Sequence, residues 1–184
     1  VREDAPIRCS SPYAVSKAAA DLHLLTLRDE RITIIRPSNC YCPGQSLHRI
    51  IPRAVLAALT GKKMKLQGNA SKSYLHADDL SAAIELLLRQ PHPGIFNVGS
   101  LNPVSMQHIV ESVASQVGKT TNEIAEVTEG RANEDQCFWI NSEKMRGLGW
   151  SPVVDFTQGI RDMIAWGRKY PEIKDMNTEY EFKP

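Results

Sequence analysis

The sequence predicts an α/β protein, because stretches with helical spacing alternate along its 184 residues with short, apolar, β-branched stretches. Residues 32–35 form a continuous apolar and β-branched run, which is typical of a buried strand. This run lies between two helical patterns, 13–27 and 50–59. No internal repeat and no low-complexity segment indicates another class of fold.

Residues that commonly begin and end helices bound most of these elements. Ser11 followed by Pro12 suits the start of the first helix, and Gly61 suits the end of the second. The expected helices are 13–27, 50–59, one capped by Asp78 or Asp79 and running to 88, 105–117, a short one after 141, and 155–169. The expected strands are 32–35, 64–67, 73–75, 95–98, 124–127 and 136–140, with a loop over 36–48.

The composition is that of an ordinary globular protein, with 42% hydrophobic and 23% charged residues. Its 22 basic and 21 acidic residues give a net charge of +1, so charge gives no reason to expect nucleic acid or an anionic membrane as a partner. The four cysteines follow neither a disulfide framework nor a zinc pattern, which favours reduced thiols in a cytoplasmic protein. No apolar run reaches membrane-spanning length, and no signal peptide is expected.

Tyr13 and Lys17 are four residues apart in the first predicted helix and therefore share one helix face. A free tyrosine has a pKa of about 10, roughly three units above neutral pH, and is a poor base alone. A nearby ammonium group favours the phenolate and lowers that pKa, so that the tyrosine can move a proton to or from a hydroxyl group. The alternative is a surface helix that contains both residue types without such a role.

Several ordered motifs resemble one enzyme family, the extended short-chain dehydrogenases/reductases. Residues 11–21, SPYAVSKAAAD, are similar to the catalytic helix of that family, and residues 35–45, IRPSNCYCPGQ, resemble its RxxNxYGPGQ segment. Residues 73–79, SYLHADD, resemble RSFxHVDD, residues 96–99 resemble YNVG, and residues 148–152 resemble LGWxP. The resemblance is to the C-terminal part of NAD-dependent nucleotide-sugar epimerases and dehydratases of the dTDP-glucose 4,6-dehydratase type.

The resemblance implies the C-terminal remainder of a Rossmann-type doubly wound sheet and a smaller mixed α/β substrate domain. Residues 1–48 would complete the NAD(P)-binding domain, and residues 49–170 would mainly form the substrate domain. Residues 73–98 would return to the Rossmann sheet, and residues 171–184 would form a surface tail. The glycine-rich turn GxGxxG that grips a dinucleotide does not occur in the sequence, so this chain alone is expected neither to hold NAD well nor to turn over.

The family's cofactor site, for NAD or NADP, is matched by three residues of this chain. Tyr13 matches the acid/base, Lys17 matches the residue that holds the nicotinamide ribose, and Pro37 matches the residue beside the nicotinamide. Most of the cofactor site would lie outside this chain. The resemblance also implies a homodimer, in which the catalytic helix packs against its partner.

The family's substrate is a nucleotide diphosphate sugar, and five residues match positions that bind it. Asn39 matches an asparagine near the phosphates, while Leu66 and Gln67 match a strand whose backbone borders the nucleotide base. Lys72 and Arg131 match arginines that hold the diphosphate, although the motif around each departs from the family pattern. The alternatives are a turn residue for Asn39, a core residue for Leu66, and solvated surface charges for Lys72 and Arg131.

These assignments favour a nucleotide-sugar 4,6-dehydratase, in which the sugar is oxidised at C4, water leaves and the hydride returns. A 4-epimerase would use the same oxidation without loss of water, and a non-catalytic sugar-nucleotide-binding module is a third interpretation. Cys40 and Cys42 with His48 or His76 suggest a metal only weakly, because no full ligand set is evident, and no metal is expected. Asp79 is expected to cap a helix or to anchor a loop.

Overall fold

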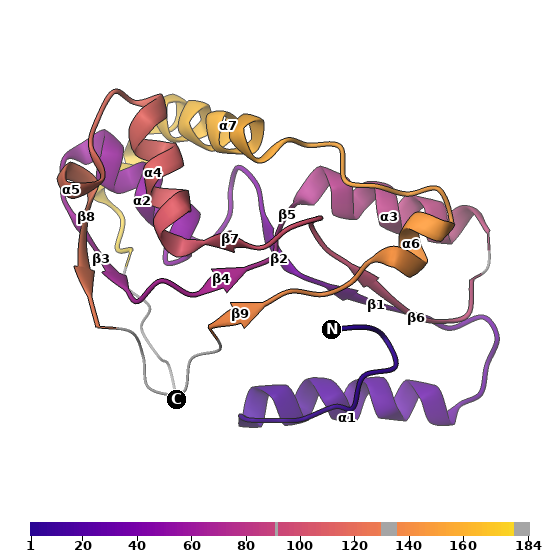
Figure 1. The fold of residues 1–184 in the computed structure, drawn as a ribbon. Coiled ribbons are helices and arrows are strands. Elements are labelled where there is room, and N and C mark those ends of the chain that lie inside the picture. The colour runs from indigo at the N-terminus through magenta and orange to yellow at the C-terminus, as the bar shows by residue number, and fades with distance from the viewer. Residues whose placement is uncertain (91, 130–135, 179–184) are drawn as a thin grey trace.

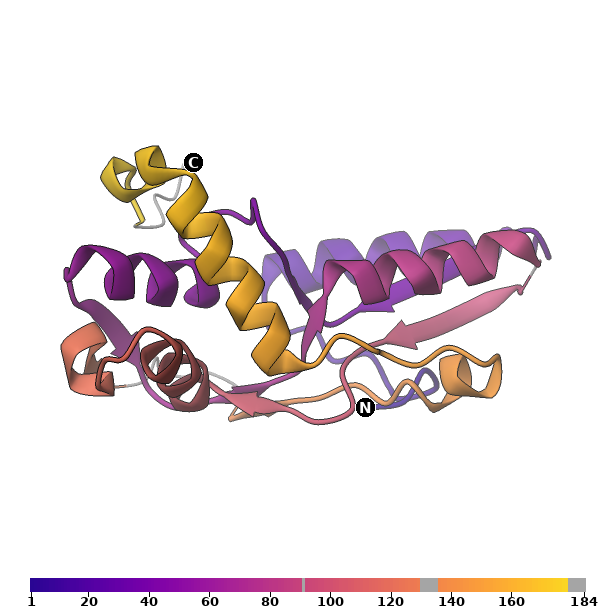
Figure 2. The same ribbon diagram turned by 90° about the horizontal axis from the view of Figure 1, so that it is seen from above.

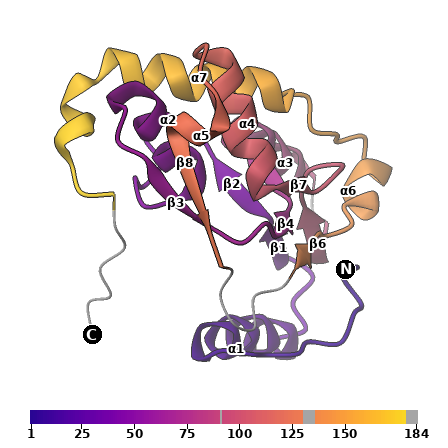
Figure 3. The same ribbon diagram turned by 60° about the vertical axis from the view of Figure 1, so that its left-hand side comes forward.

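The computed structural model describes residues 1–90, 92–129 and 136–178 of the chain. It is an α/β structure with two packed regions, one built on a pair of parallel strands and the other on three helices (Figure 1). Helix α1 (Pro12–Thr26) lies apart from both regions, along one side of the molecule (Figures 1 and 3). The α/β class predicted from the sequence is confirmed.

The strand region is built on β1 (Thr33–Pro37) and β6 (Gly94–Val98), which pair in parallel with Ile34 opposite Ile95. Helix α3 (Ala77–Arg89) and the short helix α6 (Glu143–Gly147) cover this pair (Figure 1). The side chains buried between them form a small core of Leu75, Ala83, Leu87, Phe96, Val98, Met145 and Trp150.

A second parallel pair, β2 (Asn39–Tyr41) and β5 (Tyr74–His76), lies between the two regions. Because β2 follows β1 after a single residue and β5 leads directly into α3, this pair connects the strand region to the rest of the chain. The ring of Tyr41 is 2% exposed and meets the ring of His76 edge-on, with 5.3 Å between ring centroids.

The helical region consists of α2 (Ile50–Thr60), α4 (Met106–Gln116) and α7 (Phe156–Lys169), seen from above in Figure 2. Their facing side chains form the larger core, which includes Ile51, Val55, Ile109, Val110, Val113, Ile160, Met163 and Ile164. Two glycines of α7 allow close packing. A Cβ atom at Gly159 would collide with the ring of Tyr41, and one at Gly167 would lie 2.8 Å from Leu59 Cδ1.

Short elements surround this larger core. Strand β3 (Met64–Gln67) pairs in parallel with β8 (Ala125–Thr128), which follows the helical turn α5 (Thr121–Ile124). Strand β4 (Ser71–Lys72) lies between β7 (Val104–Ser105), which is antiparallel to it, and β9 (Cys137–Phe138), which is parallel. A 3₁₀ helix, η1 (Pro171–Asp175), follows α7 and buries Ile173.

Most predicted helix boundaries are confirmed by hydrogen bonds. The side chains of Ser11, Ser105 and Asp155 each accept a backbone N–H three residues ahead, as N-cap residues do. Gly61 ends α2 with φ of 74°, a left-handed conformation that favours glycine.

Two local predictions are wrong. The loop expected over 36–48 contains the end of β1 and all of β2, because the partner of β2 lies more than thirty residues away and leaves no local signal. Helix α3 is capped by His76, whose Nδ1 accepts the N–H of Asp78, so both candidate aspartates lie in its first turn. The extended stretch expected over 124–127 is confirmed as β8, one residue later, and the helical turn before it begins with a capping box of Thr120 and Glu123.

Candidate active site

Helix α1 carries the two residues predicted to do the chemistry, and its start is well defined. Ser11 Oγ accepts a hydrogen bond from the N–H of Ala14 at 3.1 Å, and Pro12 occupies the first turn. No residue of α1 is buried. Its least exposed side chains are Ala14, Ala18 and Asp21, which lie on one face of the helix.

Tyr13 and Lys17 lie on the same side of α1, as the four-residue spacing predicts. The Lys17 ammonium is 5.6 Å from the centroid of the Tyr13 ring. That distance is within the range in which a cation and an aromatic ring attract each other. Tyr13 is 71% exposed, so the described residues bring the two groups together but leave the phenol open to solvent.

The carboxyl end of β1 supplies the next group of predicted residues. Pro37 is exposed and Asn39 is half-buried, and the Asn39 N–H donates to the carbonyl of Ser73 at 3.1 Å. Helix α1 runs antiparallel to β1, so its first turn and the carboxyl end of β1 both lie toward the middle of the molecule (Figures 1 and 2). The helix start that carries Tyr13 and the strand end that carries Pro37 are therefore on the same side.

Between Pro37 and Asn39 lies a residue that sequence reasoning did not single out. Ser38 is 7% exposed, and its hydroxyl oxygen is buried without a hydrogen-bond partner among the described residues. Buried hydroxyl groups are usually satisfied, so this one marks a place where a polar partner is missing. A hydroxyl group beside Pro37 fits the proposed position of a nicotinamide, which carries an amide.

Three of the residues predicted to bind the nucleotide sugar lie in strands: Leu66 and Gln67 in β3, and Lys72 in β4. The Leu66 side chain is 2% exposed and belongs to the larger core, so only its backbone is available to a ligand. Gln67 is exposed at the end of β3, and Lys72 is half-buried in β4. Arg131 lies outside the described residues.

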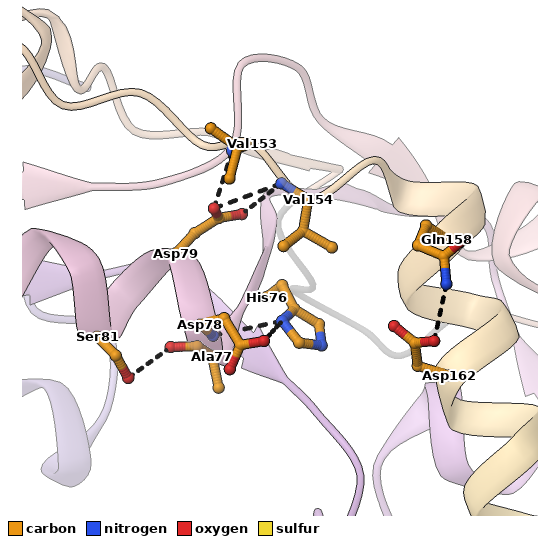
Figure 4. A network of polar contacts seen from close by, with 9 residues as sticks. All are labelled: His76, Ala77, Asp78, Asp79, Ser81, Val153, Val154, Gln158 and Asp162. Atoms are coloured by element: carbon orange, nitrogen blue, oxygen red, sulfur yellow. Dashed lines mark hydrogen bonds and ion pairs between the residues drawn. The ribbon is translucent and has the colours of Figure 1, made fainter.

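Figure 4 shows a polar network between α3 and the segment that leads into α7. The buried Asp79 carboxylate accepts the backbone N–H of Val153 at 2.8 Å and that of Val154 at 3.2 Å. The indole N–H of Trp150 donates to the Asp79 carbonyl at 3.0 Å. Asp79 therefore anchors a loop, one of the two roles predicted for it. The Nε2 atom of the nearby His76 is buried without a partner among the described residues.

The Cys40-Tyr41-Cys42 segment has the properties of a structural element. Burial raises the pKa of the Cys40 and Cys42 thiols, and Cys40 is the more buried of the two. Both thiols are therefore kept in the protonated form, which is the less reactive one. Burial raises the pKa of the Tyr41 hydroxyl as well, and the carboxylates of Asp79, Asp155 and Asp162 add to that effect. Tyr41 is thus no candidate for a base.

Within residues 1–90, 92–129 and 136–178, no group of three or more His, Cys, Asp or Glu side chains could hold a metal ion. In the same ranges, no helix has both the length and the apolar composition needed to cross a bilayer.

Parallel strands covered by helices, with a capped helix that carries tyrosine and lysine one turn apart, fit a Rossmann-type dehydratase or epimerase chain. A match to a known family identifies the class of protein more narrowly. The chain belongs to the GDP-mannose 4,6 dehydratase family, whose model matches residues 1–163.

Curated relatives agree with this family. The chain is 31% identical over 177 residues to the dTDP-glucose 4,6-dehydratase of Streptomyces griseus, covering 91% of this chain and 53% of the relative. It is 30% identical over 170 residues to the low-salt glycan biosynthesis protein Agl12 of Haloferax volcanii, covering 89% and 54%. The chain thus spans about half the length of these relatives, and a quarter of a trifunctional UDP-glucose 4,6-dehydratase of Arabidopsis thaliana.

Solved structures share the fold. A dTDP-glucose 4,6-dehydratase from Bacillus anthracis in complex with NAD matches with a TM-score of 0.84 and 32% identity, covering 92% of this chain and 56% of that one. A UDP-glucose 4-epimerase from Thermotoga maritima matches with a TM-score of 0.85 at 19% identity, over 93% and 58%. Because both match equally well, the fold alone does not separate dehydration from epimerisation.

Proposed function

We propose that this chain is the C-terminal half of an NAD-dependent nucleotide-sugar 4,6-dehydratase. The observation that carries the proposal is the Tyr13–Lys17 pair on a capped helix, within a chain of this family. Relatives of 28% to 32% identity bear the name dTDP-glucose 4,6-dehydratase, and one of them is bound to NAD. NAD, rather than NADP, is the cofactor favoured by these comparisons.

In the proposed reaction Tyr13 moves the proton of the sugar hydroxyl at C4. The Lys17 ammonium, 5.6 Å from the centroid of the Tyr13 ring, can donate to the ribose hydroxyls of the cofactor. NAD, when bound, would supply the hydride chemistry, in which a hydride is taken from C4 and, after water has left from C6, is given back at C6. A phenol that is 71% exposed is hydrated in this chain, so the proposal requires the missing half to cover it and exclude water.

We propose that the substrate's diphosphate and base lie beside strands β2, β3 and β4. Asn39 would donate its amide to a phosphate oxygen, and the cations Lys72 and Arg131 would balance the charge of the diphosphate. The base would lie beside Gln67 and the backbone of Leu66, since the Leu66 side chain is in the core. Lysine at position 72 gives a point charge in place of the bidentate fork of arginine.

Two other functions have specific support. The likeness to a 4-epimerase fold favours the same oxidation without loss of water. The exposure of Tyr13 is also compatible with a non-catalytic sugar-nucleotide-binding module.

The complete protein would be a homodimer through α1, whose side chains Val15, Leu22 and Leu25 are exposed and apolar. We assign it to the cytoplasm, because all four cysteines are free.

Mass spectrometry of the sugar product, made by the complete protein that contains this chain, tests the proposal. Incubation with dTDP-glucose and NAD is expected to give a product lighter by one water molecule, and Tyr13→Phe is expected to abolish it. A product of unchanged mass with inverted C4 configuration would establish the epimerase instead. Binding of a nucleoside diphosphate with no product of either kind would establish the binding module.

A further inference from the structure

Burial does little to determine where α1 lies. The helix has no buried residue, and two of its three half-buried side chains are alanines, which offer a single methyl group each. Side-chain hydrogen bonds from Ser16 and Thr26 go to carbonyls within the helix itself. A helix with such weak apolar contacts needs another determinant of its position if Tyr13 is to reach a substrate.

A half-buried ion pair joins α1 to β1. Arg36 Nε donates to Asp21 Oδ2 at 2.7 Å, and the two side chains are 25% and 23% exposed. The Arg2–Glu143 pair is far more exposed, at 69% and 64%. Partial removal from water strengthens a charge pair, and the planar guanidinium restricts its geometry, so the Asp21–Arg36 pair orients its elements more strictly than a surface pair does.

Arg36 lies in β1, directly before the strand end that belongs to the candidate site. It precedes Pro37 in β1 and lies opposite Asn97 in the parallel register. Its NH1 group also donates to the carbonyl of Glu3 at 3.4 Å, while the Glu3 carboxylate accepts the Asn97 N–H at 2.9 Å. One guanidinium therefore connects α1, the N-terminal segment and the strand end that carries the proposed nicotinamide contact.

We propose that Asp21 and Arg36 are positioning residues, whose ion pair sets the place of α1 relative to the carboxyl end of β1. Tyr13, Lys17 and Asp21 follow one another at four-residue intervals along α1. An ion pair at Asp21 therefore fixes the orientation of the helix side on which Tyr13 and Lys17 lie. The inference rests on the proposed function, because only a reaction at Tyr13 gives the position of α1 a catalytic meaning.

A distance measurement in the 184-residue chain tests the positioning directly. Spin labels at the exposed positions Ala20→Cys in α1 and Ala82→Cys in α3, with the four native cysteines replaced, report the separation of the two helices by pulsed electron resonance. One narrow distance is expected for the parent sequence, and Asp21→Asn is expected to lose it. Asp21→Glu, which keeps the charge, and Glu143→Gln, which breaks the exposed pair, are expected to retain it.

The outcomes separate this inference from the proposed function. A narrow distance that survives in Asp21→Asn, or is lost equally in Asp21→Glu, overturns the positioning role. Circular dichroism shows whether each variant is folded, and amide exchange of α1 with the native cysteines in place gives the same comparison without labels. In the complete enzyme, Asp21→Asn is expected to lower kcat by about tenfold or more with KM little changed, because small misplacements of reactive groups are costly. An inactive complete enzyme would refute the proposed function and leave the distance result intact.

Discussion

The helical region and helix α1 are held in opposite ways. Helices α2, α4 and α7 share a core whose central side chains, such as Val55, Ile109 and Met163, have no exposed surface. Helix α1 buries none of its residues and relies on a cap and an ion pair. The well-packed part carries the proposed contacts to the nucleotide, whereas the loosely held part carries the proposed chemistry. On the proposed function, α1 would be covered by a surface outside this chain.

The largest expected contrast is between a core side chain and one on α1. Ile109→Ala should lower the free energy of unfolding by about 2–5 kcal/mol, because it leaves a cavity in the larger core. Leu22→Ala, at a site 55% exposed, should change it by less than about 0.5 kcal/mol. Urea unfolding followed by circular dichroism measures both, and equal losses would contradict the contrast.

A smaller effect is expected where α7 meets β2. Gly159→Ala places a methyl group against the Tyr41 ring and should cost about 1–3 kcal/mol of stability through overpacking. Gly147→Ala is the matched control, because nothing lies within 4 Å of the added Cβ atom. The two unfolding midpoints should therefore differ, and a Gly159→Ala variant as stable as the control would show that the contact relaxes freely.

The anchor between α3 and α7 is expected to matter at a similar or slightly lower level. Asp79→Asn replaces an oxygen that accepts the Val154 N–H by a donor and should cost about 1–3 kcal/mol. Asp78→Asn, whose side chain is 82% exposed, should cost much less. Thermal unfolding of the two variants checks the difference, which would vanish if the Val153–Val154 segment were held by packing alone.

The smallest global effect is expected at the cap of α1. Ser11→Ala removes the hydrogen bond to Ala14 and weakens the helix locally by about 0.5–2 kcal/mol. Because α1 buries no residue, amide exchange should accelerate in its first turn while the urea midpoint of the whole chain stays unchanged. A shift of that midpoint would mean that α1 is coupled to the core more tightly than its exposure indicates.

Local signals predicted much of this fold, and long-range pairing limited the rest. The cap at Ser11, the glycine at Gly61 and the apolar run of β1 act within a few residues, and the elements they predict are present. Strand β2 was expected to be a loop, because its pairing with β5 depends on residues far along the chain. The α5 turn was not predicted either, although its capping box of Thr120 and Glu123 is a local signal.

The sequence motifs predicted which residues belong to the candidate site, but less of how those residues are arranged in space. The spacing of Tyr13 and Lys17 placed them together on one face, as the structure has them. The buried hydroxyl of Ser38 and the Asp21–Arg36 pair were not foreseen, since each depends on which elements become neighbours. The roles of Tyr13, Lys17, Pro37, Asn39, Leu66, Gln67, Lys72 and Arg131 stay predictions.

In the proposed enzyme, this chain supplies the acid/base and the substrate contacts. The residues that bind the dinucleotide lie outside it. Isothermal titration of NAD into the 184-residue chain tests this division most directly. No heat of binding is expected at micromolar NAD, because the glycine-rich turn that cradles the pyrophosphate is absent from this sequence. A micromolar Kd would contradict it.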